Sequence, residues 1–265
     1  MARSTKIVAC NWKAFLGVAR SVVVARAVSG WCKRTRYTGE VIVAPSFAAL
    51  HPVSLELDDS GIRLAAQNVS SDSDGPYTGA ISLAVLKELG CTHAILGHSE
   101  VRAGRGLACP ESDDLIAKKF GACLSDGISP ILCIGETLDD RRRGKTARVL
   151  STQLTAGTSA MYGGLSGSAH VYVAYEPVWA ISSNAPKERP VPETINDVIG
   201  DLRELLAQLR GSKAASRVRF LYGGSVDASN VASYVSMDSI DGVLVGGAST
   251  DPKKLVGMLT AIRSL

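Results

Sequence analysis

Short runs of Val, Ile, Leu and Ala recur along this chain, separated by longer stretches in which apolar residues have helical spacing. Such runs are typical of parallel strands buried on both faces, and the longer stretches can cross back over a sheet as helices. The predicted strands centre on residues 7–10, 41–44, 62–66, 93–96, 130–134, 171–175, 218–222 and 242–245. Amphipathic segments between them include 15–32, 81–89, 115–124, 149–155 and 195–209.

Eight strand-helix units in about 250 residues are typical of an α/β protein of the (β/α)8 barrel type. We therefore expect residues 1–265 to form a single barrel domain. An open, doubly wound sheet usually has fewer strands and a glycine-rich turn after the first. Here the first strand leads into Asn11-Trp12-Lys13, which contains no glycine, so a dinucleotide-binding fold is disfavoured.

The composition is that of a soluble globular protein, with 46% hydrophobic and 20% charged residues. Gly and Pro are spread along the chain, so no segment has the composition of a flexible linker. A net charge of +4 suits attraction of small anions but is too small to indicate a nucleic-acid partner. The basic run 141–145 follows Asp139 and Asp140, which favours a solvated helix face.

The sequence shows neither the long apolar run of a membrane span nor a secretory signal peptide. No apolar run approaches the roughly 20 residues of a membrane span, and residues 1–10 lack a signal-peptide pattern. We therefore expect a cytoplasmic protein that does not interact with membranes. The six cysteines form no Cys-x-x-Cys pair, which favours buried thiols over a zinc site or a disulfide framework.

Polar residues or glycines follow most of the predicted strands, at the end of a barrel where active sites lie. Glycine pairs at the start of helical segments let backbone N–H groups approach an anion, and the helix dipole favours a phosphate. The ring thus indicates a phosphorylated small molecule as ligand, without a metal or another cofactor. Its members are Asn11, Lys13, Gln67, Asn68, His98, Ser99, Glu100, Glu176 and residues 223–225 and 246–249.

Eight motifs stand along the chain: Asn11-Trp12-Lys13, Ala66-Gln67-Asn68, Tyr77-Thr78-Gly79, Gly97-His98-Ser99-Glu100, Cys133-Ile134-Gly135-Glu136, Tyr175-Glu176-Pro177-Val178-Trp179 within 174–181, Tyr222-Gly223-Gly224-Ser225-Val226, and 242–249. In content and order they resemble the motifs of the triosephosphate isomerase family, and the resemblance covers essentially the whole chain. It implies interconversion of dihydroxyacetone phosphate and glyceraldehyde 3-phosphate through an enediolate.

The resemblance also implies roles for individual residues. Glu176 would be the base that moves a proton between C1 and C2, with a pKa raised toward neutrality by its dry surroundings. His98, as a neutral imidazole, would polarise the substrate oxygens and shuttle a proton between them. Lys13 would stabilise the developing charge, Asn11 would orient it and donate a hydrogen bond, and Glu100 would pair with it.

For the phosphate, the resemblance implies backbone N–H groups from Ser182, Ser225, Gly246 and Gly247. It also implies a lid over the enediolate, with the segment 177–179 as its first hinge. Residues 182–190 make this lid about three residues longer than in most of the family, and residues 103–110 form a second insertion of about four residues.

The longer lid leaves two alternatives open. One is an isomerase of a four-carbon ketose phosphate, such as a tetrulose or erythrulose phosphate, that uses the same ring of residues. The other is a non-catalytic barrel with a binding role, which predicts damage among Lys13, His98 and Glu176. All three residues stand in their motifs, so this alternative is the weakest.

Two further positions bear on assembly. Ala80 and Val101 stand where the family commonly has a glutamate and an arginine that pair across a dimer interface. Replacing both partners of a buried ion pair by apolar groups can be nearly neutral, so the joint change is compatible with a dimer. In relatives, the loop equivalent to residues 70–78 inserts into the neighbouring subunit with its threonine near that subunit's active site. We therefore expect a homodimer with Thr78 at the interface.

Overall fold

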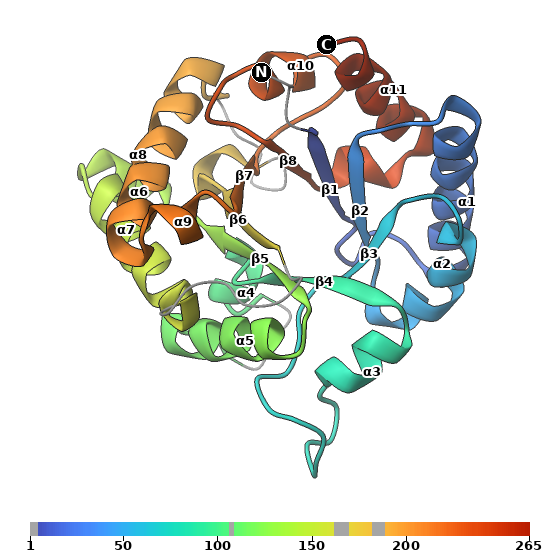
Figure 1. The fold of residues 1–265 in the computed structure, drawn as a ribbon, viewed down its shortest axis with the longest axis horizontal. Coiled ribbons are helices and arrows are strands. Elements are labelled where there is room, and N and C mark those ends of the chain that lie inside the picture. The colour runs from blue at the N-terminus through green and yellow to red at the C-terminus, as the bar shows by residue number, and fades with distance from the viewer. Residues whose placement is uncertain (1–4, 106–108, 162–169, 182–188) are drawn as a thin grey trace.

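A computed structural model describes residues 5–105, 109–161, 170–181 and 189–265. Within them, eight parallel strands pair in sequence order and close into a barrel, which confirms the predicted fold class. Figure 1 looks into this ring of strands. The strands are β1 (Ile7–Asn11), β2 (Glu40–Ala44), β3 (Arg63–Ala66), β4 (Cys91–Leu96), β5 (Ser129–Ile134), β6 (Val171–Tyr175), β7 (Val218–Tyr222) and β8 (Gly242–Val245).

The helices surround the barrel, as Figure 1 shows, and their apolar faces cover the outward side chains of the strands. Each amphipathic segment named above overlaps a helix. The helices are α1 (Val18–Thr35), α2 (Leu50–Leu57), α3 (Leu83–Glu88), α4 (Ser99–Arg102), α5 (Asp113–Ser125), α6 (Leu138–Arg142), α7 (Thr146–Gly157), α8 (Pro192–Arg210), α9 (Ser212–Ala215), α10 (Val231–Val235) and α11 (Pro252–Arg263). No helix in the described ranges is long and apolar enough to cross a membrane.

The interior of the barrel is a small, separate apolar core. It is built from alternate residues of the strands, such as Ile131 and Cys133 on β5 or Tyr172 and Ala174 on β6. The same alternation carries one step beyond β6 to Glu176, whose side chain is 5% exposed. The period-2 geometry of the strands therefore places this carboxylate over the carboxyl end of the interior core.

The segment between β3 and α3 extends away from the body of the molecule (Figure 1). Residues 72–80 within it are all exposed, and Tyr77 keeps 49% of its surface accessible. The base of the segment is closed by a hydrogen bond from Ser70 N to Ile81 O of 2.9 Å. Its tip thus has no covering surface among the described residues of its own chain.

Candidate active site

Glu176 and His98 meet at the carboxyl end of the barrel. His98 Nε2 lies 3.3 Å from Glu176 Oε1, and both side chains are almost fully buried. Glu176 Oε2 is also buried but has no hydrogen-bond partner among the described residues. A buried carboxylate oxygen without a partner is energetically costly, and such strain is typical of a site that receives a ligand. This oxygen is the one available to act as a base.

Two glycines make room for this carboxylate. A Cβ at Gly223, just beyond β7, would lie 2.5 Å from Glu176 Cγ. A Cβ at Gly135, just beyond β5, would lie 1.8 Å from the backbone oxygen of Glu176. Neither distance is compatible with a side chain, so the position of Glu176 depends on glycine on both neighbouring strands.

The protonation of His98 follows from its hydrogen bonds. Its Nδ1 accepts from Glu100 N at 3.2 Å, at the start of helix α4. A nitrogen that accepts carries no proton, so the neutral ring has its proton on Nε2, which faces Glu176. A short helix begins directly after His98, and the N–H group of Glu100 in its first turn selects this tautomer.

Lys13 is held in an unusual conformation beside this pair. Its backbone φ is 48°, in the left-handed region that few non-glycine residues adopt. Asn11 Oδ1 accepts from Lys13 N at 3.0 Å, and Gln67 Nε2 donates to Lys13 O at 2.9 Å. The predicted pairing with Glu100 is present, at 2.8 Å from Lys13 Nζ. Asn11 and Gln67 thus clamp the backbone of Lys13 from two sides.

Glu176 does not have the raised pKa that we expected from its dry surroundings. Burial acts to raise the pKa of this carboxyl, but the charge of His98 when protonated, its hydrogen bond, the Lys13 charge and a hydrogen bond from Cys133 together outweigh it. The pKa of Glu176 therefore lies below its ordinary value, and the carboxylate is ionised at neutral pH. Desolvation alone was the wrong guide because it ignored these three neighbours.

A second buried carboxylate, Glu136, supports the segment after β6. Its Oε1 accepts hydrogen bonds from Trp179 Nε1 at 2.8 Å and from the Tyr175 hydroxyl at 3.3 Å. Burial raises the pKa of Glu136 despite these donors. Arg141 stacks over the Trp179 ring at 4.3 Å, so one member of the basic run 141–145 is not simply solvated. We did not predict a role for Glu136, although it lies in a quoted motif.

Another buried cluster was missed. Glu111 pairs with the ammonium of Lys119, and Asn68 bonds both, donating to Glu111 Oε1 at 2.8 Å and accepting from Lys119 Nζ at 2.9 Å. This cluster joins the second residue after β3 to helix α5 and to the end of the 103–110 insertion. The only sequence signal was the position of Asn68 just beyond a strand.

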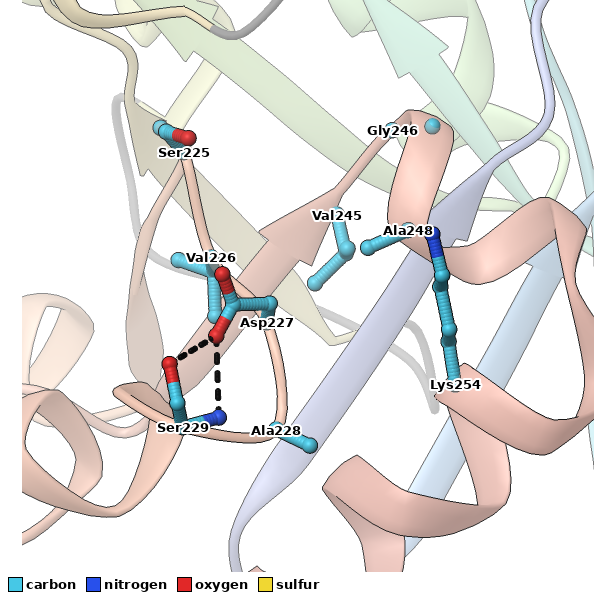
Figure 2. A pocket seen from close by; sticks show the side chains of 11 residues that line it. Ser225, Val226, Asp227, Ala228, Ser229, Val245, Gly246, Ala248 and Lys254 are labelled. Atoms are coloured by element: carbon cyan, nitrogen blue, oxygen red, sulfur yellow. Dashed lines mark hydrogen bonds between the residues drawn. The ribbon is translucent and has the colours of Figure 1, made fainter.

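The predicted phosphate residues line a pocket of about 610 Å³ between the β7 and β8 ends (Figure 2). Ser225, Gly246 and Gly247 all border it, and Gly246 also borders the pocket that contains Lys13, His98 and Glu176. Figure 2 shows Lys254 reaching from α11 toward Ala248 in this pocket, a cation that we did not predict there.

Two predicted residues are not placed at this site. Ser182 lies outside the described residues, as does most of the predicted lid. Thr78 lies in the projecting segment and does not border the pocket that contains Lys13, His98 and Glu176. The described chain by itself therefore brings together Asn11, Lys13, His98, Glu100 and Glu176, with the glycines after β7 and β8 beside them.

Comparison with known proteins decides the family. The family described as triosephosphate isomerase matches residues 6–262. The chain belongs to the triosephosphate isomerase family. A triosephosphate isomerase of Chlorobaculum tepidum is 38% identical over 95% of this chain and 98% of its own length. One from Dictyoglomus thermophilum is 35% identical over 94% of this chain and 96% of its own. One from Symbiobacterium thermophilum is 41% identical over 84% and 83%. The resemblance to triosephosphate isomerases is thus confirmed.

Proposed function

We propose that this protein interconverts dihydroxyacetone phosphate and glyceraldehyde 3-phosphate through an enediolate. The observation that carries the proposal is the buried, unpartnered Glu176 Oε2 beside His98 Nε2 and the Lys13 ammonium. Relatives that match nearly the whole chain are named triosephosphate isomerase, and no comparison favours a four-carbon substrate.

The first step is removal of a proton from C1 of the ketose. Glu176 Oε2 takes this proton, and the electron pair left behind places negative charge on the oxygen at C2. Lys13 faces this developing charge in a site from which water is largely excluded. An ammonium in such a place stabilises the charge by a few kcal/mol more than it would in water.

The second step moves a proton between the two oxygens. His98 Nε2–H, which faces Glu176 Oε1 in the free protein, donates to the oxygen at C2 and then recovers a proton from the oxygen at C1. Glu176 returns its own proton to C2. The reaction is balanced without a metal or a redox partner, because both protons that leave the substrate come back.

The phosphate is assigned to the pocket between the β7 and β8 ends. Backbone N–H groups of Ser225, Gly246 and Gly247 would hold it, with Ser182 supplying one more. Gly246 lies beside Lys13, since a Cβ there would be 3.5 Å from Lys13 Cε, so the phosphate pocket adjoins the lysine.

A coupled enzymatic assay on two substrates tests the proposal. We expect kcat/KM for glyceraldehyde 3-phosphate to exceed that for an erythrulose phosphate by at least about tenfold, because an extra carbon displaces the reacting atoms from Glu176 when the phosphate is anchored. A higher kcat/KM on the four-carbon compound would show that a four-carbon ketose phosphate is the substrate instead. No turnover of either would favour a non-catalytic role.

We further propose that the protein is a cytoplasmic homodimer in which Thr78 of one chain approaches the active site of its partner. The projecting 72–80 segment is exposed, and Phe15 and Phe47, which follow β1 and β2, keep 59% and 38% of their surface accessible. Exposed aromatic residues at the active-site end of a barrel favour a protein interface.

Analytical ultracentrifugation tests this assembly. We expect a dimer that Phe15→Asp converts to a monomer of low activity, since a charge placed in an apolar interface is costly. Val23→Asp is a matched control, because Val23 is 47% exposed on the outer face of α1. Full activity of the wild type as a monomer would contradict the proposed dimer.

A further inference from the structure

The mouth of the barrel opposite the active site contains a pocket of about 800 Å³. It is lined by residues at or just before the first positions of seven strands, from Thr5 before β1 to Arg219 on β7. Its volume lies within the range of about 300–1,000 Å³ that is common for small-molecule sites. The established chemistry of the other mouth makes no use of this pocket.

The walls of this pocket are basic. Arg63, Arg217 and Arg219 border it together with His170, whereas Glu40 is the only acidic residue in its lining. The Arg63 guanidinium has no hydrogen bond or ion pair with any described residue, and Arg63 is exposed. The described lining therefore carries an excess of positive charge that faces solvent.

Arg219 is fixed in place at the opposite side. Its Nη2 donates to Thr5 O at 2.9 Å, and its Nη1 lies 3.5 Å from Asp241 Oδ1. Asp241 in turn pairs with Arg203, so its charge is shared between two guanidinium groups. An arginine held by its neighbours loses less side-chain entropy when it binds an anion.

A linear series of hydrogen bonds from Glu40 to Thr92 forms the floor of the pocket. Tyr172 OH donates to Glu40 Oε1 at 2.7 Å, and His93 Nε2 lies 3.3 Å from the same hydroxyl. Thr92 Oγ1 completes the chain at 2.7 Å from His93 Nδ1. Burial and the nearby Arg63 and His170 lower the pKa of His93 to about 3, so its ring is neutral. Glu40 is thus engaged at the floor, and the Arg63 guanidinium is the group on the walls that is available to a ligand.

We propose that this mouth is a binding site for a small anion with two or more linked phosphate groups. Arg63 stands on β3 and Arg219 on β7, which are four strands apart in either direction round the barrel and so face each other across the mouth. A chain of linked phosphates offers oxygens to guanidinium groups on both sides of the mouth. Guanidinium groups bind phosphate oxygens with two parallel hydrogen bonds each.

Calorimetric titration of inorganic tripolyphosphate into the whole protein tests the site. Glycerol 3-phosphate is kept at saturation so that the catalytic phosphate pocket is occupied. We expect one tripolyphosphate per chain, and an about tenfold weaker Kd in Arg63→Met because a charged hydrogen-bonding partner is lost. Arg148→Met, an exposed arginine on the outer helix α7, is the matched control and leaves the Kd unchanged.

Two outcomes would overturn the proposal. One is the absence of tripolyphosphate binding once glycerol 3-phosphate is saturating, and the other is equal binding by the Arg63→Met and Arg148→Met variants. Circular dichroism checks that Arg63→Met is folded. Should it fail to fold, the NMR signal of the His170 ring in the wild-type protein decides: we expect it to shift on addition of tripolyphosphate, and an unmoved signal would refute the site.

Discussion

The two mouths of this barrel lie at opposite ends of the same strands, and inward-facing side chains line both. Their buried polar groups nevertheless differ in how many hydrogen-bond partners they have. At the amino end, Tyr172 of β6 belongs to a hydrogen-bond chain whose buried members all have partners. Two inward positions further along, Glu176 keeps one buried oxygen without a partner. An unsatisfied polar atom destabilises a fold, and at the position of Glu176 a bound substrate can relieve this cost.

The mouths differ in shape as well. A pocket of about 800 Å³ opens at the amino end, whereas Lys13, His98 and Glu176 border a pocket of only about 10 Å³ at the carboxyl end. The left-handed backbone of Lys13 adds strain there that three hydrogen-bonding neighbours hold in place. Tight packing, strain and an unpartnered oxygen thus occur together at the catalytic end.

The largest expected effect is at the catalytic lysine. Lys13→Met should lower kcat/KM by about 10²–10³-fold or more, since the charge that stabilises the enediolate is lost. Lys213→Met, on exposed α9 at the amino end, removes the same charge and should change kcat/KM by less than about twofold. Steady-state kinetics of the two variants compares the ends directly. Equal losses would mean that net charge, rather than position, controls the rate.

A glycine packed against a catalytic side chain and a glycine with free space around it should respond differently to an added methyl group. Gly223→Ala should lower kcat by about 10–100-fold because the new Cβ pushes Glu176 away from its position. Gly17→Ala places a Cβ where no atom lies within 4 Å and should leave kcat unchanged. Rapid assays of both variants measure this, and an unaffected Gly223→Ala enzyme would show that the position of Glu176 does not depend on that contact.

At the amino end the expected effect is on stability. Tyr172→Phe leaves Glu40 Oε1 and His93 Nε2 without their shared hydroxyl and should lower the free energy of unfolding by about 1–3 kcal/mol. Tyr37→Phe is the matched control, because the Tyr37 hydroxyl is buried without a partner and its removal should cost nothing. Urea denaturation compares them, and equal midpoints would show that the hydrogen-bond chain does not stabilise the fold.

The smallest expected effect concerns the Glu176 carboxyl, which we expect not to titrate near neutral pH. Because its neighbours lower its pKa, Glu176 should stay ionised from pH 9 down to about pH 5 in the free protein. The ¹³C NMR signal of its carboxyl carbon should then be constant over that range and move only at lower pH. A step between pH 5 and 8 would show that burial outweighs His98 and Lys13 after all.

The strands could be predicted from sequence because each is buried on both faces and so reads as a short apolar run. Predicted and observed strands agree to within a few residues, whereas short helices such as α4 and α6 extend too few turns to show periodicity. Most of the site could be predicted too, since catalytic residues follow strand ends. Glu136 and Glu111 could not, because their hydrogen bonds to Trp179 and Asn68 join residues that lie 43 positions apart in each case.

The pKa of Glu176 shows a second limit of sequence reasoning. It depends on which groups lie close to the carboxylate, and this is fixed by the way the barrel closes rather than by any local pattern. The basic amino-end mouth escaped notice for the same reason. Its arginines are scattered from Arg63 to Arg219 along the chain and meet only when the barrel closes.

Exchange of the substrate C1 proton with solvent tests the central assignment most directly. In D₂O, ¹H NMR should show the wild-type enzyme replacing this proton in dihydroxyacetone phosphate with deuterium. Glu176→Gln should still bind the ketose with a similar Kd but exchange the proton about 10²–10⁴-fold more slowly. Exchange at the wild-type rate in Glu176→Gln would mean that another group is the base.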